Sequence, residues 1–321
     1  MRRRFQWLLV GAIFLACIVY LDIPSVVRTL ESVPPLWLVS LLVLMTIDRI
    51  LMAWKWTGLL RALHIQIPFR TVIGYYYQGN LAGVFLPTGL GGDLLRAHLV
   101  SRRYGHTPQI FASLFMEKII GFVSAVSWAA IGALVIAWYR FGDMKSLWIG
   151  LALGGVMVVG VAFLGSLHPR VVDRVLLAVT SGPRGRIKTF VHRLIKAYAQ
   201  FGQCRHVLIL NGMLTILEHG LQLVVYVVMA KSLGIHMAVI PFIAITALFL
   251  LLYRLPISPD GWGVGEVAAI GLYGIIDISP ENAFAMAFLG HVLQTLVVLP
   301  GLWFIYRSVI FQPSLPMEKS P

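Results

Sequence analysis

The sequence predicts an all-α polytopic membrane protein, with about six full spans and two re-entrant hairpins in an inverted-topology repeat. The first observation is composition: 59% of the 321 residues are hydrophobic, 12% are charged and the mean hydropathy is +0.84, which leaves too little charge to cover a soluble globule. The second is that the basic residues behind the net charge of +13 lie in short segments between apolar runs, which argues against a nucleic-acid-binding protein. The third is that two stretches rich in Gly and Pro carry charged residues within otherwise apolar sequence.

The chain starts with a helix that resembles a signal peptide in charge and length. Three arginines follow the first residue and precede an apolar run over residues 5–21. We expect an uncleaved first span, because the same pattern begins many multi-spanning chains. A slightly acidic segment follows, which we place on the outer side of the membrane. Pro34 and Pro35 then begin a second helix over residues 36–60.

This second helix carries three charged residues, Asp48, Arg49 and Lys55. Asp48 and Arg49 point about 100 degrees apart on a helix, so they are not expected to pair with each other. We expect Lys55 and Arg61 to extend to the cytoplasmic headgroups. Asp48 lies too far from the helix end for that, and either a functional role or a structural pair with a neighbouring helix explains it.

The first Gly/Pro-rich stretch runs from Asn80 to Arg96. Basic clusters lie on both sides of it, so residues 71–95 are predicted to enter the membrane from the cytoplasm and turn back. Hydrocarbon cannot hydrogen-bond broken backbone, so such a segment must be buried by protein or line a wet cavity. The candidate substrate-binding residues here are Asn80, Pro87, Gly91, Gly92, Asp93 and Arg96.

A long span over residues 108–139 and a returning span over residues 147–167 lead to a basic segment, residues 168–206. We expect this segment to be a cytoplasmic linker. Its apolar residues between 187 and 198 recur at helical spacing, with basic residues beside them, which is typical of an amphipathic helix on an anionic leaflet. An ordinary positively charged loop also explains these charges.

The second half contains a span over residues 207–230, a second Gly/Pro-rich stretch and a last span over residues 282–310. No basic cluster interrupts residues 238–276, so this hairpin is predicted to enter from outside. Its candidate substrate-binding residues are Arg254, Pro256, Gly261, Gly263, Gly265 and Glu266.

The two halves, residues 36–139 and 207–310, therefore mirror each other with opposite orientation. Inverted repeats whose broken segments meet near the midplane are the architecture of alternating-access transporters. Alternatively, the two hairpins are four short full spans, and this topology is also consistent with the sequence.

The two stretches have the chemistry of an anion site. A helix beginning at either glycine-rich turn would direct its positive end at an anion, and Arg96 and Arg254 can hold a phosphate through paired donors. Asp93 and Glu266 lie beside these positions, where a low dielectric favours the neutral carboxyl group and allows proton uptake during transport. Asp93 can instead pair with Arg96 one helical turn away, as a structural contact. Further candidates for the polar cavity or a proton site are Asp48, Glu117, Glu218 and His291.

At these residues the sequence resembles the lysylphosphatidylglycerol synthetase transmembrane-region family of flippase-like proteins. The resemblance rests on Asn80, Leu86-Pro87, Gly92-Asp93 and Arg96, and on Leu255-Pro256, Gly261, Gly263, Gly265 and Glu266. It covers nearly the whole chain. It implies a membrane flippase, joined in bifunctional members to a soluble aminoacyl transferase that makes the lipid. The chain stops at Pro321, so we expect the flippase part alone. The acid at position 93 is often Glu in the family, a mild departure, and the identity of the lipid is not inherited.

The sequence thus favours a lipid flippase of a bacterial-type plasma membrane, with both termini cytoplasmic. The expected substrate is an anionic or phosphate-bearing lipid, such as an aminoacylated phospholipid or a polyprenyl phosphate. We expect no cofactor and no metal, because no metal-ligand spacing is present. A second copy of the chain and an enzyme of lipid synthesis are candidate partners. The alternative is an intramembrane enzyme or accessory subunit of glycolipid synthesis; an ion channel is the weakest candidate, because no filter sequence is present.

Overall fold

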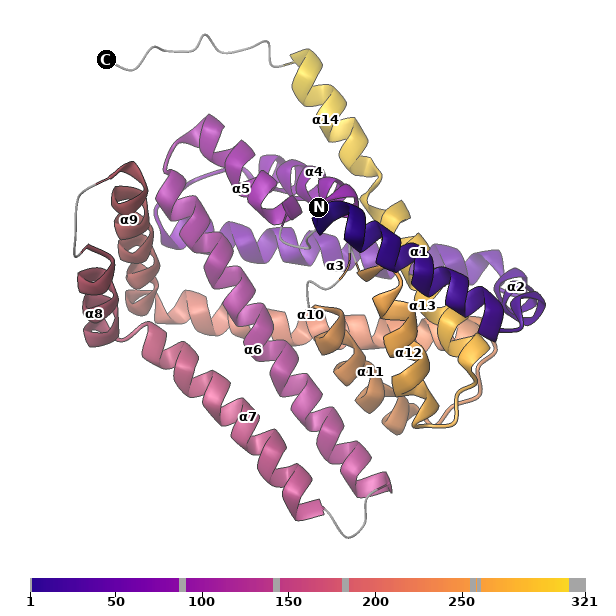
Figure 1. The fold of residues 1–321 in the computed structure, drawn as a ribbon. Coiled ribbons are helices and arrows are strands. Elements are labelled where there is room, and N and C mark those ends of the chain that lie inside the picture. Colours follow the sequence, from indigo (N-terminus) through magenta and orange to yellow (C-terminus); the bar gives the residue numbers. More distant parts are fainter. Residues whose placement is uncertain are drawn as a thin grey trace.

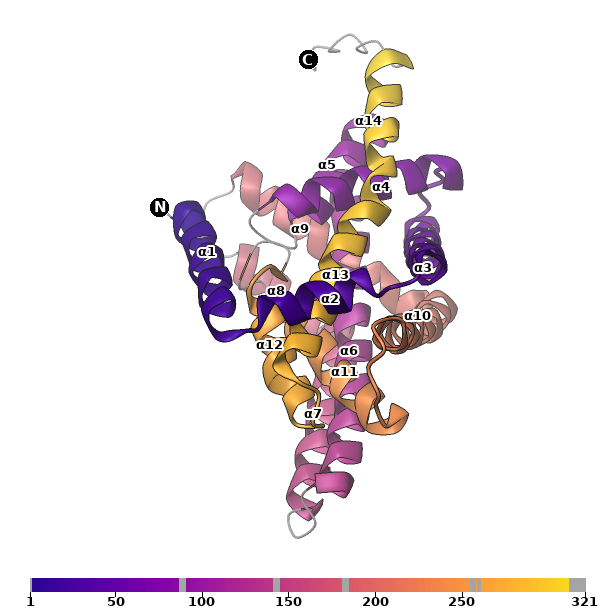
Figure 2. The ribbon, with the colours of Figure 1, turned by 90° about the vertical axis from the view of Figure 1, so that its right-hand side faces the viewer.

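The computed structural model describes residues 2–86, 91–140, 145–180, 185–254, 258 and 261–311, and in these it contains helices and no strand. Four helical segments of this part of the chain are long and apolar enough to cross a membrane, and six if each of two bent helix pairs is counted as one span. The predicted class, an all-α polytopic membrane protein, is therefore confirmed. Figures 1 and 2 show the arrangement of the helices.

The helices and their bounds follow the predicted spans closely. They are α1 (Arg2–Tyr20), α2 (Ile23–Glu31), α3 (Pro35–Ala62), α4 (Phe69–Phe85), α5 (Gly91–Tyr104), α6 (Thr107–Arg140), α7 (Lys145–Ser166), α8 (Pro169–Thr180), α9 (Arg186–Gln200), α10 (Arg205–Ser232), α11 (Val239–Tyr253), α12 (Val264–Gly274), α13 (Pro280–Val298) and α14 (Pro300–Phe311). A short 3-10 turn, Phe201–Gln203, connects α9 and α10.

Helices α3 and α10 lie side by side, and α6 crosses the bundle next to them (Figure 1). Each of the two paired helices exposes one apolar stripe at helical spacing, as expected of a face turned to acyl chains. On α3 the stripe is Leu36, Val39, Val43, Ile47, Ile50 and Trp54, and on α10 it is Ile209, Leu210, Met213, Ile216, Leu217 and Val224. The opposite faces of both helices point into the bundle and carry the buried charged residues Asp48, Lys55 and Glu218.

The first predicted hairpin consists of α4 and α5, which pack against each other closely. A Cβ atom on Gly79 would approach Gly92 O and Arg96 Cβ to 2.8 Å, and one on Gly92 would overlap the Gly79 carbonyl oxygen. The predicted hairpin ended at residue 95, whereas α5 continues to Tyr104. The glycines therefore allow the two helices to approach at this crossing.

The second predicted hairpin consists of α11 and α12, which also contact each other. Gly261 and Gly263, just before α12, have φ angles of 80° and 79°, which glycine adopts without a Cβ penalty. A Cβ on Gly132 of α6 would overlap the carbonyl oxygen of Ala244, so α6 and α11 also cross at close range. The re-entrant course of both hairpins and the inverted symmetry of the halves stay predictions.

The basic linker forms two helices, α8 and α9, at the end of the bundle where α10 begins (Figure 1). The predicted amphipathic helix is present as α9, and its apolar side packs on α6 through Phe190 and Phe111, whose rings meet edge to face at 6.0 Å. Tyr198 lies within hydrogen-bond distance of Ser166, at 2.8 Å. Contact of this helix with an anionic leaflet stays a prediction.

The last predicted span is divided into α13 and α14, with Leu299 between them. Pro300, which begins α14, has no backbone N–H, so it cannot continue the hydrogen-bond ladder of α13. In Figure 2, α14 extends from one end of the bundle and the lower parts of α6 and α7 extend from the opposite end.

Two buried apolar clusters lie along the length of α3. One contains Leu41 together with residues of α10 to α13, and the other contains Trp56 together with residues of α4, α5, α6 and α9. Asp48 and Arg49 fall between these clusters on α3. The polar site of the protein is built at this junction.

Candidate functional site

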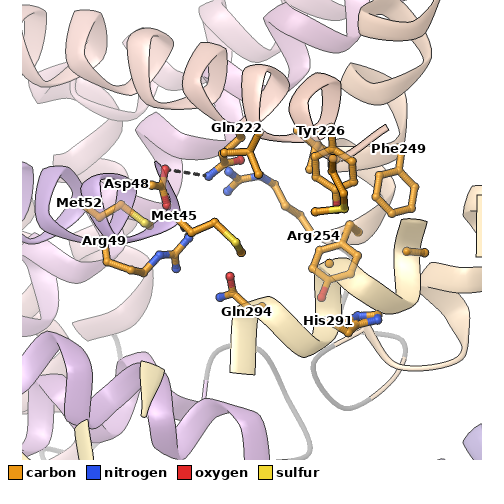
Figure 3. Close-up of a pocket in the computed structure, with 16 residues that line it drawn as sticks. Met45, Asp48, Arg49, Met52, Gln222, Tyr226, Phe249, Arg254, His291 and Gln294 are labelled. Atoms are coloured by element: carbon orange, nitrogen blue, oxygen red, sulfur yellow. Dashed lines mark hydrogen bonds and ion pairs between the residues drawn. The ribbon is translucent and has the colours of Figure 1, made fainter. Parts of the chain in front are cut away.

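A cavity of about 220 Å³ opens within the bundle between α3, α10, α11 and α13 (Figure 3). Its wall is made by Met45, Asp48, Arg49, Met52, Gln222, Val225, Tyr226, Met229, Phe249, Leu250, Tyr253, Arg254, Ala287, Gly290, His291 and Gln294. Charged and amide groups thus share the wall with methionines and aromatic rings. Such a cavity can receive a ligand that has both a polar and an apolar part.

Asp48 and Arg49 form an ion pair on the α3 side of the cavity, with 2.5 Å between Oδ2 and Nη2. The prediction that these neighbours do not pair is wrong, because the long arginine side chain can fold back along the helix although the Cβ atoms diverge. Gln222 of α10 lies at 3.5 Å from the other oxygen of Asp48 (Figure 3). Asp48 is thus buried and bound from two helices.

Lys55 forms an ion pair with Glu218, and both side chains are almost completely buried. The expectation that Lys55 reaches the headgroups is wrong, because α10 places a carboxylate opposite it inside the bundle. Lys55 Nζ also donates to Thr215 at 3.0 Å, and Gln222 donates to Glu218 at 3.0 Å. Gln222 therefore connects this pair with Asp48, so that a continuous polar network joins α3 to α10.

Arg254, at the end of α11, reaches across the cavity toward α10 (Figure 3). Its guanidinium donates to Nε2 of His219. The other ring nitrogen of His219 lies 2.7 Å from Ser124 Oγ on α6. Since Nε2 accepts a hydrogen bond, Nδ1 carries the proton and donates to the serine, so His219 is a neutral imidazole that positions Arg254.

Glu266 and His291 form the polar corner between α12 and α13. Glu266 is fully buried, and its carboxylate accepts from the Gly263 backbone N–H and from His291 Nδ1, each at 2.7 Å. Trp262 stacks on the imidazole ring with 4.5 Å between centroids. The positive end of α12 is therefore occupied by the chain's own carboxylate rather than left open for an anion.

Arg96 is buried in a separate cluster formed by α3, α4, α5 and α6. Its guanidinium lies 4.2 Å from the ring centroids of both Trp56 and Tyr76. It donates to Glu117 at 2.7 Å and to Asp93 at 3.1 Å. Arg96 does not line the cavity that Arg254 lines, so the structure does not bring the two predicted phosphate-binding arginines around one cavity.

Asp93 is shared between two cations, because Lys118 forms an ion pair with its second oxygen. The structural pairing of Asp93 with Arg96 one turn away is confirmed. Glu117 also accepts from the Tyr76 hydroxyl at 3.1 Å. This cluster holds α3 to α6 together, and Nε and Nη1 of Arg96 have no hydrogen-bond partner among the described residues.

The remaining predicted residues are placed as follows. Gly91 and Gly92 form the first turn of α5, and Gly265 lies under His291 and Tyr253, where a Cβ would approach their rings to 3.1 and 3.2 Å. Asn80 has a buried amide nitrogen without a hydrogen-bond partner among the described residues. Pro87 and Pro256 lie outside the described residues. Of the candidates, the structure places Asp48, Arg254 and His291 on the cavity, with Glu218 and Glu266 directly behind it.

Sequence reasoning missed Arg49, Gln222 and Gln294 as residues of the cavity wall. A signal was present in the register of α3, where Met45, Arg49 and Met52 share one face at spacings of four and three residues. The signal is weak, because methionines at such spacing are usually ordinary core residues.

Comparison with known proteins agrees with this architecture. Residues 7–301 match the family model described as the lysylphosphatidylglycerol synthase TM region. The chain is also 20% identical over 291 residues to a UPF0104 membrane protein of Methanothermobacter thermautotrophicus, an alignment that covers 84% of this chain and 82% of the relative.

Proposed function

The chain belongs to the lysylphosphatidylglycerol synthase TM region family of membrane proteins, and from this premise we propose that it is a flippase for a phosphate-bearing lipid. The headgroup would cross between the leaflets through the polar cavity, while the acyl or prenyl chains stay in the bilayer. The proposed location is a bacterial-type plasma membrane with both termini in the cytoplasm.

The proposal rests on the observation that the cavity wall combines cationic and apolar side chains. Arg49 and Arg254 offer guanidinium groups that suit phosphate oxygens, and Met45, Met52 and Phe249 provide apolar surface beside them. The cavity also lies between α3 of the first predicted half and α10, α11 and α13 of the second. Transport sites at the interface between two halves are characteristic of alternating access.

Proton coupling is part of the proposal. The Glu266–His291 pair is buried next to the cavity, and His291 forms part of its wall. Glu266 accepts from Nδ1 of His291, so the opposite nitrogen, Nε2, is turned away from Glu266. Uptake and release of one proton at this pair during a cycle would link lipid movement to a proton gradient.

The test is reconstitution of the full chain into vesicles whose inner and outer leaflets can be distinguished by quenching of a fluorescent lipid. We expect movement of a labelled phosphate-bearing lipid well above the rate of protein-free vesicles. Glu266→Gln is expected to reduce it, because it changes the group that holds His291 at the cavity wall. Rates equal to those of empty vesicles would refute the transport function. Formation of a new lipid product by the pure protein would instead favour the intramembrane enzyme.

A further inference from the structure

The charged side chains that line the cavity wall do not balance, and the excess is positive. The charged side chains of its wall are the carboxylate of Asp48 and the guanidinium groups of Arg49 and Arg254. Asp48 is bound to Arg49. Behind the wall, Glu218 forms an ion pair with Lys55, and Glu266 accepts hydrogen bonds from His291 and from the Gly263 backbone. Among the described residues, no carboxylate forms an ion pair with Arg254.

The partner that Arg254 does have carries no compensating charge. Its guanidinium donates to Nε2 of His219, so this nitrogen carries no proton, and with its one proton on Nδ1, directed at Ser124, the imidazole is neutral. A cation inside a membrane-spanning bundle without a counterion is costly unless a ligand supplies the negative charge. Arg254 is exposed toward the cavity, so a ligand there can reach it.

Two further polar atoms of the wall lack a hydrogen-bond partner among the described residues. These are Nε of Arg49 and Nε2 of His291, which are both buried. His291 is only 3% exposed, and its other nitrogen is held by Glu266. Because a guanidinium N–H is a donor, the missing partner of Arg49 is an acceptor, as a phosphate oxygen would be.

We propose that this cavity selects a lipid headgroup that bears phosphate charge and no ammonium group, and that it disfavours an aminoacylated headgroup. The inference rests on the proposed function and names the substrate class of the same site. An ammonium group would need a carboxylate that is free to receive it, and the carboxylate of the wall is already bound by Arg49 and Gln222. It would also lie near the uncompensated charge of Arg254, and juxtaposed like charges oppose binding.

A comparison of lipids with different headgroups in reconstituted vesicles tests this selectivity. Phosphatidylglycerol, lysylphosphatidylglycerol and a short polyprenyl phosphate, each with a fluorescent label on its apolar part, are followed separately across the bilayer. We expect phosphatidylglycerol or the polyprenyl phosphate to move at least about tenfold faster than the lysylated lipid, a difference of about 1.4 kcal/mol. Whichever of phosphatidylglycerol and the polyprenyl phosphate moves faster identifies the class of lipid that supplies the phosphate. Equal or faster movement of the lysylated lipid would overturn the inference and leave the flippase function intact.

If no lipid moves, the flippase function is refuted but the selectivity of the cavity is not. A binding measurement tests the selectivity in that case. The purified full chain is incubated with an equimolar mixture of the three lipids, and the retained lipids are quantified by native mass spectrometry. Preferential retention of the lipids without an ammonium group supports the inference, and preferential or equal retention of the lysylated lipid refutes it. Arg254→Gln should reduce the preference severalfold. Lys231→Gln, which removes an exposed charge from the end of α10, should leave it unchanged.

Discussion

Lys55 of α3 and Glu218 of α10 form an ion pair in which the side chains are only 3% and 2% exposed. The pair lies between the neighbouring helices α3 and α10, and Thr215 and Gln222 extend it. Two charges buried in this way are tolerated only together, because each would otherwise be an uncompensated ion in a low dielectric. The pair therefore fixes the register of α3 against α10. These two helices contribute Asp48, Arg49 and Gln222 to the cavity wall.

We predict that Glu218→Gln destabilises the protein by ~3–5 kcal/mol, because it leaves the Lys55 ammonium buried without a counterion. The double variant Lys55→Met, Glu218→Leu should be markedly more stable than this single variant, since it removes both charges. Thermal unfolding in detergent, followed by intrinsic fluorescence, measures the difference. A double variant that is less stable than Glu218→Gln would contradict this account.

Arg96 offers a second test, because its planar group is held between Trp56 and Tyr76 while it binds two carboxylates. Arg96→Lys keeps the charge but loses the stacked geometry and the forked donors. We predict a loss of ~1–3 kcal/mol, from hydrogen bonds to charged groups that are not remade. The unfolding temperature should fall for Arg96→Lys and stay unchanged for Arg102→Lys, an exposed arginine in the last turn of α5.

The helix packing at the first hairpin makes Gly92 sensitive to any side chain. Gly92→Ala should separate α4 from α5, because the added methyl group would overlap the backbone of Gly79 and Gly83. We expect a loss of ~1–3 kcal/mol, as is typical of overpacked cores. Gly150→Ala is the matched control, since nothing lies within 4 Å of its added Cβ, and it should be neutral or stabilising. Equal unfolding temperatures for the two variants would contradict the close crossing.

Much of the fold could be predicted from the sequence, because apolar length and the placement of Lys and Arg determine membrane spans. The helix starts at Gly91 and just after Gly263 were also predictable from the glycine-rich turns that precede them. The pairing of Lys55 was not predictable, because its distance from the end of α3 at Ala62 allows both an extended and a buried side chain. Only the position of α10, a contact across 163 residues, decides between them.

The candidate site was predicted less completely, for a related reason. Ionisable residues in apolar segments are visible in a sequence, so Asp48, Arg254 and His291 were found. Which of them share a cavity depends on how the helices cross, and Arg96 was assigned to the same site although Trp56 and Tyr76 enclose it elsewhere. Neutral polar residues such as Gln222 and Gln294 carry no sequence signal that separates a cavity wall from an ordinary helix contact.

The Glu266–His291 pair leads to the last prediction, which concerns proton coupling. The groups that face His291 are Glu266, Trp262 and Tyr253, with Arg254, Arg49 and Asp48 across the cavity. In vesicles with an imposed pH gradient, we expect the rate of lipid movement by the native chain to depend on the direction of the gradient. Glu266→Gln replaces the carboxyl group by an amide that cannot carry the transported proton, so the dependence should fall by at least about tenfold, or 1.4 kcal/mol. His236→Gln, an exposed histidine beyond the end of α10, should retain the full dependence. A dependence that survives unchanged in Glu266→Gln would place the coupling proton on another group.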